Sequence, residues 1–84
     1  MLVGKEVIHE YRGRGIVQAV ENGQIVVRFG ADYDLAFPYP REFSRMLSLK
    51  EYDPAEQARI DADLRADRMA RAQAYRAHRE ADKA

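Results

Sequence analysis

The stretch IVQAVENGQIVVRF, residues Ile16–Phe29, decides the fold of this chain because it holds the clearest turn signal in the sequence. Asn22 and Gly23 both tolerate a positive φ, which a type I′ turn requires at its two central positions. Valines and isoleucines stand on both sides of this pair. The sequence therefore predicts a β-hairpin with a two-residue loop. The cross-strand pairs that this loop implies are Glu21 with Gln24, Val20 with Ile25, Gln18 with Val27 and Ile16 with Phe29.

One face of the predicted hairpin is apolar, since side chains alternate between the two faces of a strand. We expect that face to line the core. It carries Ile16, Val20, Ile25, Val27 and Phe29, with Gln18 as the exception. The opposite face carries Val17, Ala19, Glu21, Gln24, Val26 and Arg28.

Further short strands are expected on both sides of the hairpin. Before it, a strand over Glu6–Tyr11 leads into a tight, exposed turn at Gly13–Gly15. After a second turn comes a strand over Leu35–Tyr39, and its prolines are confined either to a sheet edge or to the end of the strand. A helical turn over Pro40–Met46 and a closing strand over Leu47–Leu49 follow. Five short strands in about 50 residues predict a small SH3-like barrel.

The rest of the chain is typical of a helix. Residues 51–84 contain no glycine, and alanine supplies ten of their fifteen hydrophobic residues. Asp53 is a good N-cap, Pro54 suits the first helical position, and Glu56 stands where it can reach back to the cap. We expect one helix from Pro54 to about residue 81, on the order of 40 Å long.

The expected fold class is mostly β plus α, with two parts. Residues 1–50 are predicted to form a five-stranded SH3/Tudor-like barrel, and residues 53–82 one long, charged, alanine-rich C-terminal helix. A barrel of that size is only about 25 Å across, so part of the helix must project beyond it.

The composition argues against several classes of function. The 14 basic and 14 acidic residues cancel, so the chain lacks the positive excess typical of proteins that bind nucleic acid through phosphate contacts. It has no cysteine, and its two histidines lie in different halves, so we expect no metal and no cofactor. Neither a nucleophile elbow nor a phosphate-binding loop is present, and we expect no enzyme activity.

The location expected from the sequence is the cytoplasm. The longest aliphatic run, Ile25–Val27, is far too short to span a bilayer, so no membrane association is expected. The first residues lack the basic start and long apolar stretch of a secretory signal.

Two segments, GKEVIHEYRGRGIVQAVENGQIVVRFG and LAFPYPREFSRMLSL, resemble a family of small bacterial Tudor/SH3-like barrels. The resemblance covers roughly residues 3–49 and does not extend to the helix. It departs at Arg12, where the family often has phenylalanine. The chain is more loosely similar to the Tudor-like tails of bacterial repair helicases and of RNA-polymerase-associated ATPases. The matching positions are Gly4, Val7, His9, Gly13, Gly15, Ile16, Val27, Phe29, Phe37, Tyr39, Pro40, Phe43 and Leu47.

Arginines and tyrosines of the β-rich half form the candidate binding surface. Such a surface would suit single-stranded nucleic acid, because arginines pair with phosphates and bases stack on aromatic rings. The alternative is a solvated surface, since acidic residues lie among the arginines in the sequence. A cage of Tyr11, Tyr33 and Tyr39 for methylated side chains is a further alternative. The full candidate set is Tyr11, Arg12, Arg14, Arg28, Tyr33, Tyr39, Arg41 and Arg45.

The helix offers a second candidate interface at Ile60, Leu64, Met69 and Tyr75. On a helical wheel, Ile60, Leu64 and Tyr75 fall within about 60° of one another, and Met69 lies opposite among alanines. Either the first turns pack on the barrel and the end is solvated, or the alanine side receives another helix. That second helix would belong to a partner or to a second copy of the chain in a homodimer.

The resemblance implies docking onto a protein or nucleic acid without catalysis. We therefore expect a non-catalytic binding module that docks onto a larger protein, in a nucleic-acid-processing complex. Direct nucleic-acid binding through the loop arginines is the first alternative. A phage-type inhibitor that blocks a bacterial complex is the second.

Overall fold

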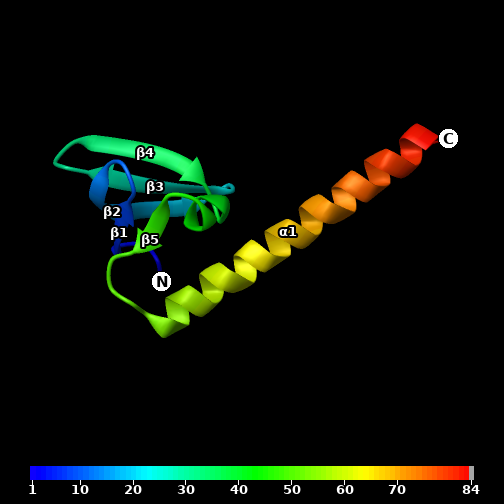
Figure 1. The fold of residues 1–84 in the computed structure, drawn as a ribbon. Helices are drawn as coiled ribbons and strands as arrows, with labels where there is room; N and C mark the ends of the chain where they lie inside the picture. Colours follow the sequence, from blue (N-terminus) through cyan, green and yellow to red (C-terminus); the bar gives the residue numbers. More distant parts are fainter. Residues whose placement is uncertain (84) are drawn as a thin grey trace.

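The computed structural model describes the backbone of residues 1–83 and the side chains of residues 1–75. The strands form one antiparallel sheet in the order β4-β3-β2-β1-β5. The helix α1 begins below β5 and runs diagonally away from the sheet (Figure 1). No helix in this described part is long and apolar enough to cross a membrane. The elements are β1 (Glu6–His9), β2 (Gly13–Glu21), β3 (Gln24–Phe29), β4 (Tyr33–Pro38), the 3₁₀ turn η1 (Arg41–Ser44), β5 (Leu47–Leu49) and α1 (Pro54–Lys83).

The sheet is open, so the closed barrel expected from the sequence is not confirmed. Strands β4 and β5 are its two edges, and across residues 1–83 no ladder joins them. The short turn η1 lies between them in the chain and contacts both. The fold is therefore a five-stranded antiparallel sheet followed by one C-terminal helix.

The tip of the hairpin is formed as predicted. Asn22 and Gly23 have φ values of 53° and 72°, the left-handed conformation that this turn requires. Glu21 lies opposite Gln24, and the next pair towards the base also follows the predicted register.

A bulge at Gln18 changes the register nearer the base of the hairpin. The pairing shifts there, so Val17 lies opposite Val27 and Ile16 opposite Arg28. One extra residue in a strand reverses which face the preceding side chains take. Val17 is accordingly 1% exposed, whereas Ile16 is 46% exposed. The pairs expected for Gln18 and Ile16, and the core position expected for Ile16, are therefore wrong.

Gly15 shows why the bulged register packs well. The residue is buried, and a Cβ built there would lie 2.5 Å from Val27 Cγ1 and 2.9 Å from Phe29 Cε1. A side chain at position 15 would collide with the core, so glycine lets β2 approach the Phe29 ring closely.

The tight turn expected at Gly13–Gly15 lies earlier in the chain, because β1 ends at His9 and β2 already begins at Gly13. The His9 Nδ1 atom accepts hydrogen bonds from the backbone N–H groups of Tyr11 and Arg12, at 3.1 and 3.2 Å. These bonds stabilise the turn over residues 10–12, and they shorten the strand expected over Glu6–Tyr11.

The remaining short elements are present with shifted ends. β4 is an edge strand, which is one of the two alternatives left open by the sequence, and it begins at Tyr33 and stops at Pro38. The expected helical turn shortens to Arg41–Ser44, and β5 covers Leu47–Leu49 as predicted. The peptide bond between Tyr39 and Pro40 is cis.

The core lies between one face of the sheet and the first turns of α1. Its buried residues are Leu2, Val7, Val17, Ile25, Val27, Phe29, Leu47 and Ile60. Phe37 packs at its margin, with an edge-to-face contact to Phe29 and a stacked contact to His9. Ile60 is the residue of α1 that enters this core, with 0% exposure, and Leu64 packs against it from the next turn.

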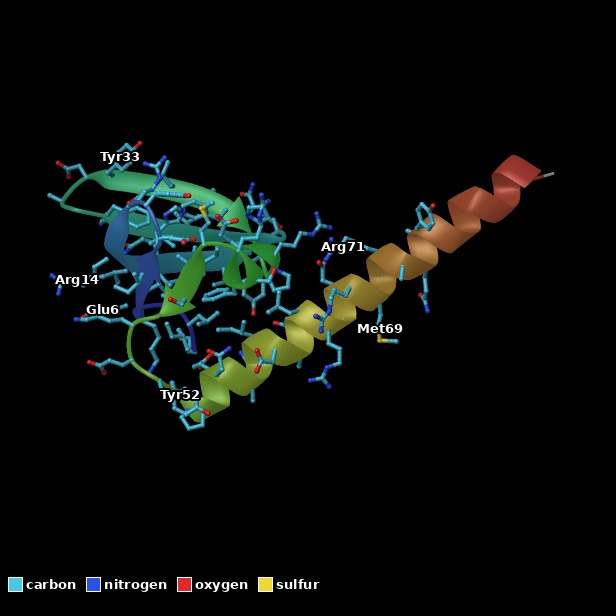
Figure 2. All side chains as sticks on the ribbon, in the orientation of Figure 1. Glu6, Arg14, Tyr33, Tyr52, Met69 and Arg71 are labelled. Carbon is cyan, nitrogen blue, oxygen red and sulfur yellow. The ribbon has the colours of Figure 1, made fainter. Side chains whose placement is uncertain are left out.

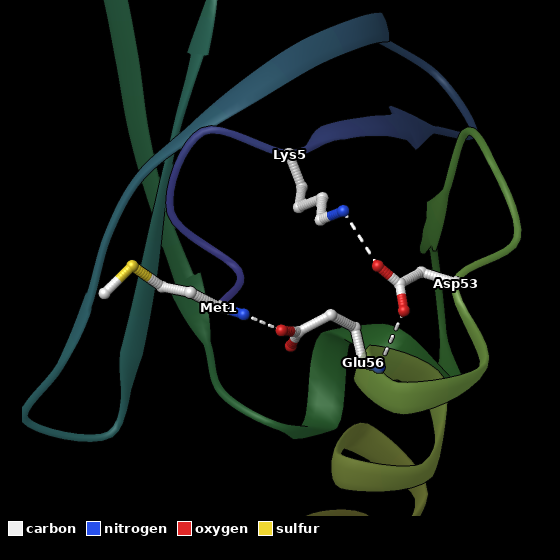
Figure 3. Close-up of polar contacts among 4 residues, drawn as sticks. All are labelled: Met1, Lys5, Asp53 and Glu56. Carbon is white, nitrogen blue, oxygen red and sulfur yellow. Dashed lines mark hydrogen bonds and ion pairs between the residues drawn. The ribbon is translucent and has the colours of Figure 1, made fainter.

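Ionic contacts hold the start of α1 against the N-terminal segment (Figure 3). Asp53 caps the helix, since its Oδ1 accepts a hydrogen bond from the Glu56 backbone N–H at 3.2 Å. Lys5 Nζ donates a hydrogen bond to the other Asp53 oxygen at 2.8 Å. This hydrogen bond is the largest cause of the lowered pKa of Asp53. The Glu56 carboxylate does not reach back to the cap as expected; it is buried and pairs with the amino group of Met1.

Candidate binding surface

The candidate residues of the sheet separate into two groups, at opposite ends of β4. One group surrounds the turn after β1, where Tyr11 is 78% exposed and Tyr33 is 53% exposed. The Arg12 guanidinium lies over the Tyr33 ring, 6.0 Å from its centroid, which is a cation–π distance. Tyr33 lies at the start of β4, far from α1 (Figure 2). This group is a small, exposed aromatic and cationic patch.

Two candidate arginines near this patch are paired with carboxylates. Arg28 donates two hydrogen bonds to Asp34, at 2.7 and 3.0 Å. These bonds lower the pKa of Asp34 and raise that of Arg28. Arg14 lies 3.7 Å from a Glu6 carboxylate oxygen. Acidic neighbours thus balance the charge of both arginines.

Tyr39 and Arg41 form the second group and contact α1. The Tyr39 hydroxyl donates a 2.6 Å hydrogen bond to Asp63. Burial, and then this bond, raises the pKa of Tyr39 far above its usual value. Arg41 donates to Asp67 at 3.1 Å. Because Tyr39 faces the helix, the three-tyrosine cage considered from the sequence is not formed.

Asp67 connects the sheet to the helix arginines. It accepts from Arg41 and also lies 3.1 Å from Arg71 Nε, one helical turn further on. The Arg41 hydrogen bond is the largest cause of its lowered pKa, and Arg71 adds to the effect. This shared carboxylate fixes the spacing between η1 and the middle of α1.

A groove of about 360 Å³ lies beside this contact, between η1 and α1. Arginines from three successive turns of the helix line it, and Ser44 closes it from the side of η1. Arg45, the next residue, lines an adjoining hollow of about 410 Å³ that also reaches Ser44. The residues that line the groove are Ser44, Asp61, Leu64, Arg65, Arg68 and Arg71.

The groove arginines were not among the residues selected from the sequence. Arg65, Arg68 and Arg71 stand three residues apart, so they share one side of a helix. That spacing was available as a signal. What they would face depends on where η1 packs, which the sequence did not reveal.

The candidate helix interface also divides in two. Ile60 and Leu64 pack on the core, whereas Met69 and Tyr75 are 60% and 65% exposed. Met69 and Arg71 project from opposite sides of α1, with Arg71 on the side that faces the sheet (Figure 2). The four residues therefore do not form one continuous interface.

Comparisons with protein families, with curated proteins and with solved structures found no match for this chain.

Within residues 1–75, whose side chains the structure describes, no group of three or more histidine, cysteine or acidic side chains is arranged to hold a metal ion. The Nδ1 atom of the buried His9 accepts hydrogen bonds from two backbone N–H groups, and its Nε2 atom lies 3.8 Å from a Glu42 carboxylate oxygen. Glu42 is itself buried, so this pair supports the turn and η1 from inside the fold.

Proposed function

We propose that this chain is a non-catalytic binding module that docks onto a larger protein through the distal part of α1. The single observation that carries the proposal is the length of the helix that the sheet leaves uncovered. Among the side chains of α1 that the structure describes, which end at Tyr75, Asp67 is the last with a polar contact to the sheet side, yet the helix continues to Lys83. The whole molecule extends 53 Å in its long direction but only 27 and 21 Å in the others.

A helical segment without tertiary support is costly to maintain. Burial of an apolar face supplies most of the stability of helices in proteins. A partner that covers this segment would provide that burial. Its outer side offers Met69 among small residues, because Ala62, Ala66 and Ala70 are exposed as well.

The SH3/Tudor-like assignment belongs to the same proposal. It is supported by an antiparallel sheet of five short strands, with η1 between the two edge strands. Modules of this kind dock onto other macromolecules, as the resemblance of residues 3–49 implies. The role of a phage-type inhibitor would use the same docking surface, and no described residue favours it separately.

Site-specific photo-crosslinking in the native cell tests this proposal. A photoreactive phenylalanine analogue replaces Met69, and a matched variant carries it at Tyr52, which is 79% exposed in the loop before α1. We expect one discrete adduct with another protein from position 69 and none from position 52. An adduct of twice the chain mass would identify a second copy as the partner. Equal labelling from the two positions, or none from position 69, would contradict the proposal.

A further inference from the structure

We infer that the groove between η1 and α1 binds a short stretch of single-stranded nucleic acid. Its phosphates would lie on the arginines of α1, and a base would stack on Tyr75. Arg71 lies on the side of α1 that faces the sheet, opposite Met69 (Figure 2). Arg65 lies about 40° from Met69 on the helical wheel, so the two proposed contacts share part of the helix surface. The inference rests on the groove and its charge, and it stands whether or not Met69 contacts a protein.

Charge is the first argument, because the groove is positive in a chain whose total charge is zero. Arg65, Arg68 and Arg71 line it, and Arg41 stands at its edge. Asp61 and Asp67 are the acidic residues beside them, which leaves a local net charge of +2 (four minus two).

The pairing state of these arginines is the second argument. Arg14 and Arg28 on the sheet are balanced by carboxylates, but Arg65 and Arg68 make no ion pair with any carboxylate in residues 1–75. Asp61, the acidic residue that lines the groove, accepts a 3.0 Å hydrogen bond from Gln57. Two guanidinium groups in a concave site thus keep their donors for an anion, and arginine suits phosphate oxygens because it can bind them in a bidentate manner.

The alignment of the side chains indicates a linear polyanion. At 100° per residue, positions 65, 68, 71 and 75 fall within an arc of about 120°. They extend over about 15 Å of the helix axis. A single small anion would occupy only part of such a row, whereas a nucleic-acid backbone presents one charge after another along its length.

Tyr75 and the shape of the groove favour a single strand over a duplex. The Tyr75 ring is 65% exposed and stands one turn beyond Arg71 on the same side of α1. An exposed ring beside a row of arginines is the arrangement on which unpaired bases stack, and in a duplex the base faces are already stacked. A concavity of about 360 Å³ suits a ligand of small-molecule size, such as one or two nucleotides.

Fluorescence anisotropy of labelled dT12 and rU12 with the full-length chain tests the inference. We expect at least one of the two probes to bind at about 50 mM salt. A 12-base-pair duplex should bind more weakly. Three phosphate contacts predict a slope of about −2 for log K against log salt, from about −0.7 for each contact to a single strand. Affinity should then fall about 16-fold between 50 and 200 mM salt. Binding of only one of the two probes would identify the ligand as DNA or as RNA.

Matched variants locate the site. Arg65→Gln combined with Arg68→Gln should weaken binding at least tenfold and reduce the slope to about −0.7. Lys50→Gln combined with Arg59→Gln removes the same charge from exposed positions outside the groove, and should change affinity less than threefold. Tyr75→Ala should weaken binding at least fivefold, and Tyr52→Ala should leave it unchanged. Circular dichroism confirms that each variant is folded.

Three results would overturn the inference. The first is an unchanged anisotropy of both single-stranded probes at about 50 mM salt. The second is an equal loss of affinity in the two double variants that remove positive charge, which would indicate nonspecific attraction. The third is tighter binding of the duplex together with no effect of Tyr75→Ala.

Discussion

Ile60→Ala tests the contact that attaches α1 to the sheet. The side chain is fully buried, and it is the residue through which the helix enters the core. The substitution removes three carbon groups, worth about 0.8 kcal/mol each, or about 2.4 kcal/mol in total. The cavity left behind adds about 1 kcal/mol if the surroundings relax only in part. We therefore expect a loss of about 3–4 kcal/mol in the free energy of unfolding.

A loss of that size is large for a domain of 84 residues. It corresponds to a decrease in thermal midpoint on the order of 12–30 °C, at about 4–8 °C for each kcal/mol. Urea denaturation followed by circular dichroism measures the free energy, and a thermal scan measures the midpoint. Met69→Ala on the same helix is the control, because its side chain is 60% exposed and its removal should change stability by less than about 0.5 kcal/mol. A free energy of unfolding for Ile60→Ala within about 0.5 kcal/mol of wild type would contradict the packing of α1 on the sheet described above.

Four further predictions address the core, the hairpin, the distal helix and the loss of stability at acidic pH. Phe29→Ala should cost about 3–5 kcal/mol in urea denaturation, because the ring is buried; a midpoint near wild type would contradict the core. Gly23→Val should destabilise the chain measurably because its φ is 72°, whereas Glu21→Lys should have little effect; equal midpoints would argue against the type I′ turn. Residues 1–67 alone should keep a thermal midpoint within a few degrees of full length, and an unfolded fragment would show that the distal helix supports the core. Asp67 has a lowered pKa, so its contribution to stability is complete above the unfolded-state pKa of about 3.9 and is lost as pH falls through the lower folded-state value. Asp67→Asn should therefore lower the thermal midpoint at pH 7. A difference in midpoint from wild type that did not shrink towards pH 3 would contradict this.

The two functional proposals are separable in the same protein. Met69 and Arg71 lie on opposite sides of α1 (Figure 2), so a variant at one position leaves the other side intact. A chain that crosslinks through position 69 but does not bind dT12 or rU12 would be a protein-docking module only. A chain that binds both would connect a protein partner to a nucleic acid.

Local interactions explain what the sequence by itself determined. Asn22 and Gly23 specify the hairpin tip, since the turn depends on the φ preferences of those two residues alone. The start of α1 is similarly local, because Asp53 caps the helix and Pro54 is suited to its first position. The edge position of β4 also follows from its own chemistry, as Pro38 cannot donate a ladder hydrogen bond.

Contacts between distant residues decided the rest. The bulge at Gln18 brings Val17 rather than Ile16 into the core, because the base of the hairpin must leave Gly15 beneath the Phe29 ring. A pattern of alternating residues cannot reveal an extra residue in one strand, since the benefit of the bulge comes from packing across the sheet.

The same reason applies to the candidate surface. Tyr39 and Arg41 were expected on an open binding face, but Asp63 and Asp67 of α1 bind them. These partners lie 24 and 26 residues further along the chain, so no local pattern connects them. The groove exists only because the projecting helix passes η1. The sequence determined which arginines share a side of the helix. The tertiary structure decided what that side faces.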